Sequence, residues 1–315
     1  MKVFVAGAAG AIGIRLIPQL VANGHQVVAT TRSERKFAML RALGAEPVAL
    51  DGLDAAAVGE AVSLASPDVI VHQMSALAGG ANLKKFDQWF HTTNALRTEG
   101  TGHLLAAAEA AGVRKLVAQS YTGWTNIREG GPVKTEADPL DPHPAKWQRE
   151  SIGALAHLER TVTAAPLEGV VLRYGNFYGS GASDELVDLI KHRKMPVIGD
   201  GAGIWSWIHL DDAAAATVAA VEHGHAGTYN IVDDEPAPVA EWLPYLAECI
   251  GAKRPMRVPT WLGRMAAGET TVQWMTQARG ASNAKAKHEL GWRPGWATWR
   301  TGFRHGLRDV AGTAA

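Results

Sequence analysis

Short apolar runs alternate with segments of helical periodicity along the first 230 residues of the chain. The apolar runs indicate buried strands over residues 3–6, 26–30, 46–50, 68–72, 113–118, 169–172 and 228–232. The segments between them predict helices over residues 12–20, 33–43, 54–65, 84–111, 145–163 and 211–222. This alternation predicts a Rossmann-type, doubly wound parallel sheet with helices on both faces, an α/β fold.

Two segments depart from the alternation. Residues 122–144 are dense in proline and glycine, which predicts a long loop, and a loop of this length in a compact domain is usually functional. Beyond residue 233, tryptophan, proline and arginine become frequent, which indicates a smaller lobe over the carboxyl ends of the strands. We therefore predict a dinucleotide-binding domain (1–175 with 211–232) and a substrate-binding lobe (176–210 with 233–315).

Charge and cysteine content narrow the partners and the compartment. The 31 acidic and 31 basic side chains balance, so nothing electrostatic favours nucleic acid or an anionic membrane. No apolar run approaches the roughly 20 residues that cross a bilayer, and Met1-Lys2 lead directly into the first strand without room for a signal peptide. The single cysteine, Cys249, excludes an internal disulfide, so we expect a cytoplasmic protein. We predict no metal site, because His223 and His225 lack a third ligand.

A glycine turn joins the first strand to the first helix. Gly7, Gly10 and Gly13 follow one another at three-residue spacing. Gly7 permits the turn out of the strand, Gly10 lets a pyrophosphate approach the backbone, and Gly13 lets the helix lie close to the sheet. The helix N-terminus at Ala11 and Ile12 offers N–H groups to phosphates. The turn therefore predicts a dinucleotide site.

Further segments carry a family resemblance. The fourth strand leads into Gln73-Met74-Ser75, Asn94 follows in the next helix, and the fifth strand ends at Gln119-Ser120. Residues 172–179 have the sequence LRYGNFYG, and residues 207–212 have the sequence WIHLDD. In this order, and with the glycine turn, the segments resemble the short-chain dehydrogenase/reductase superfamily in its extended, epimerase/dehydratase-like branch.

The resemblance implies a nicotinamide dinucleotide cofactor, a small-molecule substrate and an oxidoreductase activity. Relatives often form homodimers through the helices that correspond to residues 84–111 and 145–163, so a homodimer is one arrangement that the resemblance suggests. Besides the glycine turn, the cofactor contacts that it implies are Asp51, Gly52, Gln73, Met74, Ser75, Asn94, Ser120, Tyr174 and Asn176.

The end of the second strand bears on the choice of cofactor. Sites that prefer NAD usually place an acid here for the ribose hydroxyls, whereas this chain has Thr31 and Arg32, with Arg35 and Lys36 just beyond. Thr31 and Arg32 could bind a 2′-phosphate, since arginine pairs well with phosphate groups. We predict NADP as the cofactor, with NAD as the alternative.

The catalytic pair of the family is missing from its expected place. Relatives carry Tyr-x-x-x-Lys on the helix after the proline-rich loop, and counting back from Glu159 puts Ser151 and Leu155 at those positions. No tyrosine occurs between Tyr121 and Tyr174. A lysine beside the tyrosine phenol, whose pKa is ordinarily about 10, favours its ionised form. Without the pair, the protein needs another proton source or a reaction that needs none.

Three residues are candidates for the chemistry that remains. Ser120 takes the family position that binds the reacting oxygen, and Tyr121 or Tyr178, or ordered water, could supply a proton. Because neighbouring strand residues point to opposite faces, Ser120 and Tyr121 reach one substrate only if the strand ends before them. For His72 and Arg173 we expect structural roles or, for Arg173, orientation of the substrate.

These observations predict an NADP-dependent oxidoreductase that reduces a small carbonyl, enone or imine-type metabolite. Conjugate reduction fits the missing pair, since an enolate can be protonated later. One alternative is a nucleotide-sugar epimerase or dehydratase, although that chemistry needs a base to start the oxidation of a hydroxyl. Another is a cofactor-binding sensor or scaffold without turnover.

Overall fold

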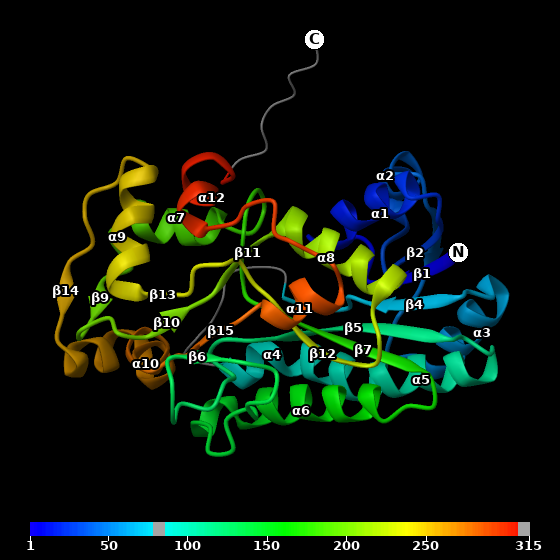
Figure 1. Cartoon of the computed structure of the whole chain (residues 1–315), viewed down its shortest axis with the longest axis horizontal. Helices are drawn as coiled ribbons and strands as arrows, with labels where there is room; N and C mark the ends of the chain where they lie inside the picture. Colours follow the sequence, from blue (N-terminus) through cyan, green and yellow to red (C-terminus); the bar gives the residue numbers. More distant parts are fainter. Residues whose placement is uncertain (78–85, 308–315) are drawn as a thin grey trace, which may run out of the picture.

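A seven-stranded sheet forms the centre of the computed structural model, which describes residues 1–77 and 86–307 (Figure 1). The strand order is β3-β2-β1-β4-β5-β7-β12, and every neighbouring pair is parallel. The strands are β1 (Lys2–Ala6), β2 (Gln26–Thr31), β3 (Glu46–Ala49), β4 (Val69–His72), β5 (Lys115–Tyr121), β7 (Glu168–Tyr174) and β12 (Gly227–Ile231). The predicted doubly wound α/β fold is confirmed.

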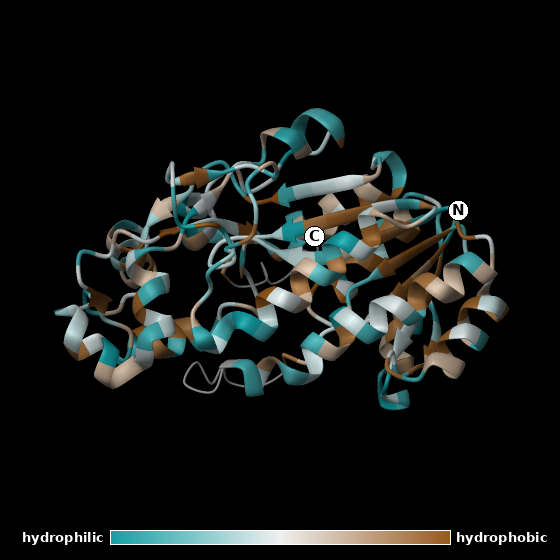
Figure 2. Ribbon diagram, turned by 90° about the horizontal axis from the view of Figure 1, so that it is seen from below, coloured by the Kyte–Doolittle hydropathy of each residue, from teal (hydrophilic) through white to brown (hydrophobic). Residues whose placement is uncertain are grey.

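Both faces of the sheet are buried beneath helices. In β1, Val3 and Val5 enter one apolar core, while Phe4 and Ala6 enter the other. Burial on both faces explains why the strands are almost continuously apolar, as the brown strands of Figure 2 show. The first core is covered by α1 (Gly13–Ala22), α2 (Phe37–Ala42), α8 (Leu210–His223) and α11 (Ala284–Glu289). The second is covered by α3 (Ala55–Ala65), α5 (Thr101–Ala110) and α6 (Arg149–Thr163).

The helix predicted over residues 84–111 contains an irregular turn beside the sheet edge. Helix α4 (Phe86–Ala95) continues through a π-helical turn, η3 (Leu96–Gly100), into α5, while positions 84 and 85 lie outside the described residues. Gly52 packs close to this turn, since a Cβ there would lie 2.3 Å from the Met74 sulfur and 3.3 Å from Leu96. Short 3₁₀ turns precede α2 and α6 at η1 (Glu34–Lys36) and η4 (Lys146–Gln148).

Two predicted boundaries need correction. Strand β5 ends at Tyr121 and not at residue 118, because its polar last residues pair with residues of β7 up to Tyr174. These residues carry no apolar signal, which is why the hydropathy pattern missed them. Helix α8 begins at Leu210, and His209 caps it by accepting a hydrogen bond from the Asp211 N–H at 3.2 Å. Asp211 and Asp212 therefore lie in its first turn and are not its caps.

A smaller lobe with its own core lies beside the carboxyl ends of the strands (Figure 1). Trp207, Trp242, Trp299 and Phe303 are buried in this core. Trp292, by contrast, packs with α11 in the first sheet core. The elements in this part of the chain are β8 (Asn176–Tyr178), α7 (Asp184–Lys191), β9 (Val197–Ile198), β10 (Ile204–Trp205), β11 (Trp207–His209), β13 (Ala237–Pro238), α9 (Val239–Cys249), β14 (Arg257–Val258), α10 (Thr260–Thr276), β15 (Gly280–Ala281) and α12 (Trp299–His305).

The proline-rich stretch 122–144 lies without helix between β5 and the lobe. A short strand within it, β6 (Val133–Lys134), pairs in parallel with β15. Arg128 forms an ion pair with Asp141 at 2.9 Å, and its backbone carbonyl accepts a hydrogen bond from Arg279 Nε at 2.9 Å. The ion pair closes the loop on itself, and the Arg279 contact holds it against the segment that follows α10. Over residues 1–77 and 86–307, no helix has the length and apolarity that a membrane crossing requires.

Candidate active site

A cleft of about 1240 Å³ follows the carboxyl ends of β3, β2, β1, β4 and β5. Its volume exceeds the roughly 300–1,000 Å³ of a typical ligand pocket. Ligands in open parallel sheets bind at this edge. Most of the predicted cofactor contacts line the cleft, namely Gly7, Gly10, Ala11, Ile12, Gly13, Thr31, Arg32, Asp51, Gly52, Gln73, Met74, Ser75 and Asn176.

The glycine turn fits the pyrophosphate of a dinucleotide. Gly7 has a φ of +87°, and a Cβ there would lie 2.6 Å from the Gln73 carbonyl oxygen. A Cβ on Gly13 would lie 2.2 Å from the Ala8 carbonyl oxygen, so a side chain would push α1 off the sheet. At Gly10 the nearest atom to a Cβ is the Gly7 oxygen at 3.4 Å, which leaves its cleft side open. Residues 10–13 thus form a bare backbone cradle at the start of a helix, which suits phosphate oxygens.

Cationic side chains line the cleft at the end of β2. Arg32 and Lys36 are exposed there, and Lys36 Nζ donates to the Ala9 carbonyl at 3.3 Å. Thr31 Oγ1 accepts a hydrogen bond from the Ser33 N–H at 3.2 Å. Within the described residues no ion pair joins Arg32 to a carboxylate. This end of the cleft therefore has a guanidinium group available to an anionic ligand.

A buried histidine shapes the loop after β4. His72 Nδ1 accepts the Met74 N–H at 3.2 Å, so its proton lies on Nε2, which donates to the Leu96 carbonyl at 3.2 Å. Burial lowers the pKa of His72 to about 4, and the ring is neutral at physiological pH. The histidine therefore holds the backbone of residues 73–75 at the cleft wall, in agreement with the structural role predicted for it.

Tyr174 lies behind the cleft wall, which corrects its prediction as a direct cofactor contact. It is buried, and its hydroxyl shares a 2.7 Å hydrogen bond with Thr217 Oγ1. Gln73 Nε2 donates to the same hydroxyl at 3.0 Å. Gln73 lines the cleft and Tyr174 does not, so Tyr174 holds a side chain of the cleft wall and does not itself line the cleft.

Asn94 also faces away from the cleft. Its amide donates to Ser151 Oγ at 3.1 Å, and Ser151 Oγ donates to Asp87 Oδ1 at 3.3 Å. Ser151 and Leu155, at the positions where the resemblance places tyrosine and lysine, are both fully buried in α6. Asn94 is therefore committed to an internal network between α4 and α6, which corrects its prediction as a cofactor contact.

Ser120, predicted to contact the substrate, instead forms a hydrogen bond inside the protein. Its hydroxyl donates to Glu159 Oε1 at 2.7 Å, and the Glu159 carboxylate binds Arg173 in a bidentate pair at 2.8 and 2.7 Å. All three side chains are buried. Because β5 continues to Tyr121, strand alternation turns Ser120 to the face opposite Gln119 and Tyr121, which line the cleft.

Tyr178 is buried in the lobe core, so it is not placed to give a proton to the cleft. Its ring packs edge-on against Trp207 and Phe303. A Cβ on Gly302 would lie 2.1 Å from its hydroxyl oxygen, which shows how closely α12 covers it. Burial, with Asp233 and Asp212 nearby, raises the pKa of Tyr178 far above its ordinary value.

Tyr121 is the candidate from the sequence whose side chain does line the cleft. Its hydroxyl donates to Asn176 Oδ1 at 2.7 Å, and Asn176 Nδ2 donates to the Ser206 carbonyl at 3.1 Å. Burial raises the pKa of Tyr121 well above the ordinary value. The phenol is therefore a neutral hydrogen-bonding group held at a fixed place, and a poor acid.

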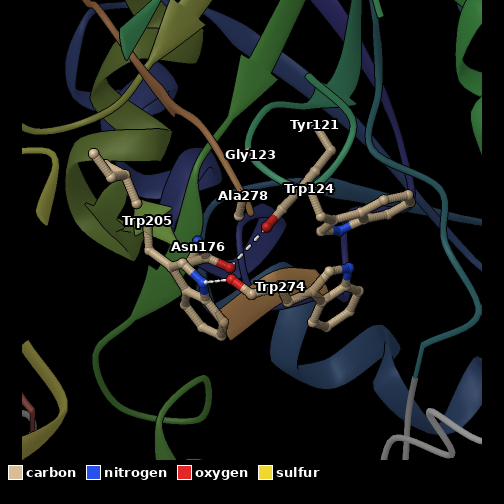
Figure 3. A pocket seen from close by; sticks show the side chains of 8 residues that line it. Tyr121, Gly123, Trp124, Asn176, Trp205, Trp274 and Ala278 are labelled. Atoms are coloured by element: carbon tan, nitrogen blue, oxygen red, sulfur yellow. Dashed lines mark hydrogen bonds between the residues drawn. The ribbon is translucent and has the colours of Figure 1, made fainter. Parts of the chain in front are cut away.

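An aromatic wall closes the β5 end of the cleft. It consists of Trp89 and Phe90 from α4, Trp124 from the loop after β5, and Trp274 from α10. Phe90 and Trp124 have ring centroids 6.2 Å apart, and Trp124 stacks on Trp274 at 5.6 Å (Figure 3). Trp124, three residues beyond Tyr121, was recognisable as a neighbour of the site; Trp274 becomes one only through the fold.

Comparison with known proteins identifies the class. The model of the NAD dependent epimerase/dehydratase family matches residues 3–232, and the chain belongs to this family. The fold is similar to a dTDP-glucose 4,6-dehydratase from Streptomyces venezuelae with NAD bound, at a TM-score of 0.76 and 22% identity over 98% of this chain and 96% of that one. The fold is also similar to a UDP-glucose 4-epimerase from Thermotoga maritima, at a TM-score of 0.75 and 22% identity over 98% of this chain and 97% of that one.

The curated relatives include reductases. A 3-diazoavenalumate denitrifying reductase of a Streptomyces species is 43% identical over 96% of this chain and 99% of its own length. A 2-alkyl-3-oxoalkanoate reductase of Stenotrophomonas maltophilia is 30% identical over 81% of this chain and 77% of its own length. The protein is thus an NAD(P)-dependent oxidoreductase of the short-chain dehydrogenase/reductase type, which confirms the predicted enzyme class.

Proposed function

We propose that this enzyme is an NADPH-dependent reductase that replaces the diazo group of an aromatic compound by hydrogen and releases dinitrogen. The observation that carries the proposal is the β5 end of the cleft, which offers aromatic rings and a hydroxyl that is a poor acid. The relative named as a 3-diazoavenalumate denitrifying reductase supports the same reaction.

The distribution of charged groups along the cleft supports a reaction without a protein acid. Asp51, Arg32 and Lys36 line its β2–β3 end. Asp184 and Glu185 line it at the start of α7, shortly after Ser180, whose carbonyl binds Arg15 of α1 at 2.8 Å. Among the lining residues in the described segments 73–77, 89–96 and 119–124, the titratable side chain is that of Tyr121.

The strand order orients the cofactor in this cleft. A dinucleotide with its pyrophosphate on residues 10–13 of the β1 turn would place one nucleoside over β2 and β3, and the other over β4 and β5. The cationic β2 end suits the adenosine 2′-phosphate of NADP, and Gln73, Met74 and Ser75 would hold the nicotinamide half. The substrate would then lie between the nicotinamide and the aromatic wall.

The proposed reaction balances without a proton. Reduced nicotinamide supplies a hydride when it is bound. The ring carbon forms a carbon–hydrogen bond with the electron pair of that hydride, and the carbon–nitrogen bond breaks. Dinitrogen leaves with the electron pair of the broken bond, so an aryl diazonium and a hydride give an arene and N₂. The protein has to hold the ring flat beside the cofactor and keep water away, which the aromatic wall suits.

Ketone reduction is a second candidate, in line with the small carbonyl substrate that the sequence predicts. The Tyr121 hydroxyl at the cleft wall and the relative named as a 2-alkyl-3-oxoalkanoate reductase favour it. This reaction needs a proton for the new alkoxide, and the raised pKa of Tyr121 makes that phenol a weaker donor than an ordinary tyrosine. An epimerase or dehydratase would need a base at the same place.

The experiment compares substrates with the purified enzyme and NADPH. We expect 3-diazoavenalumate to be converted to the denitrified product, with one equivalent each of NADPH consumed and N₂ released, and 2-alkyl-3-oxoalkanoates to be turned over poorly. Tyr121→Phe should retain denitrifying turnover within about tenfold, because no proton transfer is lost. Turnover of the oxoalkanoate alone, abolished by Tyr121→Phe, would refute the first function in favour of the second.

We also propose where the enzyme acts and how it assembles. A cytoplasmic enzyme suits the lone, partly buried Cys249 and a cofactor kept reduced there. A homodimer through α4, α5 and α6 would pair the helices that correspond to residues 84–111 and 145–163. Sedimentation at micromolar concentration tests the assembly, since a monomer would exclude it.

A further inference from the structure

Four residues form a junction between the cleft and a smaller cavity behind it. Tyr121, Trp124, Asn176 and Trp274 line both (Figure 3). The smaller cavity has a volume of about 10 Å³, which is space for roughly one water molecule. A ring held by these residues therefore stays on the cleft side, which leads to the cofactor cradle.

The rings of the junction are held in place before any ligand arrives. Trp124 and Trp274 stack with an interplanar angle of 23°, and Tyr121 lies 5.4 Å from Trp124 at 32°. The backbone carbonyl of Trp274 accepts a hydrogen bond from Trp205 Nε1 at 2.9 Å, which fixes this part of α10 (Figure 3). Trp124 and Trp274 cover each other's facing sides, so a flat aromatic partner meets them at the parts of the pair that line the cleft.

The polar pair at the junction has a defined hydrogen-bonding capacity. The Tyr121 hydroxyl donates its hydrogen bond to Asn176 Oδ1, and the Asn176 amide donates one of its two N–H groups to the Ser206 carbonyl. What remains is a lone pair on Tyr121 Oη, the second lone pair of Asn176 Oδ1 and one N–H. A group that both donates and accepts satisfies this set, whereas a group that only accepts leaves the oxygen lone pairs without a proton.

We propose that the junction of Tyr121, Trp124, Asn176 and Trp274 is a subsite for a phenol ring, with the ring against the two tryptophans and its hydroxyl on the Tyr121–Asn176 pair. This deepens the proposed function and rests on it for the reaction, but the subsite binds its ring whether or not a diazo group is present. The enzyme would thus select hydroxylated aromatic substrates.

Calorimetry on the enzyme loaded with NADP⁺ tests the subsite with stable probes. We expect 4-hydroxycinnamate to bind about tenfold more tightly than 4-methoxycinnamate, which keeps the oxygen but has no proton to donate. Tyr121→Phe should reduce this ratio to about threefold or less. Trp274→Ala should weaken 4-hydroxycinnamate about tenfold. Trp261→Ala is the matched control on the same helix, because its side chain is 61% exposed and does not line either cavity.

Three results would overturn the phenol subsite. Equal binding of the two cinnamates, equal effects of Trp274→Ala and Trp261→Ala, or no binding of 4-hydroxycinnamate to the loaded enzyme overturns the subsite. NADP⁺ affinity, measured first in every variant, reports whether the cleft is intact. Selective binding of the phenol with no turnover of 3-diazoavenalumate would uphold the subsite and refute the proposed reaction, so the two failures are distinguishable.

Discussion

Ser120 and Tyr121 are neighbours in one strand, yet their side chains have opposite surroundings. The Ser120 hydroxyl lies in the Glu159–Arg173 cluster, and Tyr121 lies at the cleft. We expect Ser120→Ala to lower the free energy of unfolding by about 1 kcal/mol, since Glu159 keeps both bonds to Arg173. Turnover should stay within a few-fold. A loss of about a hundredfold or more with unchanged stability would restore the catalytic role predicted from the motif.

Arg32 tests the cofactor preference. Because its guanidinium lines the cleft without a carboxylate partner among the described residues, it is available to a 2′-phosphate. We expect Arg32→Ala to raise the dissociation constant of NADPH at least about tenfold and to leave that of NADH unchanged, as measured by fluorescence titration. Arg35→Ala is the control, since Arg35 is also exposed but does not line the cleft. Equal loss of both nucleotides in Arg32→Ala would contradict the NADP assignment.

Residue positions were predictable where a glycine or a strand end imposed the geometry. Gly7 and Gly13 are required by close backbone approaches, and Gly10 leaves the cleft side of the turn open, so the glycine spacing between a strand and a helix located the cradle. Asn94 and Tyr174 were placed at the cofactor by motif, but their direction depends on the register of α4 and β7. Motif spacing does not report which way a side chain points.

At the scale of elements, β4 and the loop after it depend on one neutral histidine. The unfolded state binds a proton at His72 below pH 6.5, whereas the native state does so only below about pH 4. The contribution of His72 to the free energy of unfolding is therefore fully present above about pH 6.5. It falls by about 3 kcal/mol as the pH drops to about 4.

Urea unfolding at pH 7 and pH 5 measures this loss. His72→Asn keeps one donor and one acceptor but does not titrate, so it should lose less stability than the natural protein between the two pH values. The pKa values of Asp212 and Asp233 are raised in the native state, so these groups increase the free energy of unfolding as the pH falls. Both proteins contain them, so their contributions cancel in the comparison. Identical pH dependence in the two proteins would contradict the assignment to His72.

Helices and strands could be predicted from the sequence where their buried sides are apolar. The strands of the sheet were predicted because both faces are buried, and the helices because each buries one side. The short strands of the lobe were not predicted, since two-residue pairs such as β6 with β15 carry no periodic signal. The end of β5 was missed for the same reason, and with it the orientation of Ser120.

At the scale of the whole molecule, the active site is built from segments distant in sequence. Trp89, Trp124 and Trp274 come from α4, the proline-rich loop and α10, and the lobe brings them together at one end of the sheet. The sequence predicted a lobe over the strand ends, but it did not indicate which of the lobe's tryptophans would reach the site. On the proposed function, that lobe completes a site where a flat substrate would meet the cofactor.

In the proposed reaction, hydride reaches the substrate without a proton from the protein or solvent. The most direct measurement is the isotopic content of the product formed from 3-diazoavenalumate with NADPH deuterated at the transferred position of C4. We expect one cofactor deuterium at the carbon that carried the diazo group, and none from D₂O when unlabelled NADPH is used. Solvent deuterium at that carbon, with none from the cofactor, would contradict the claim.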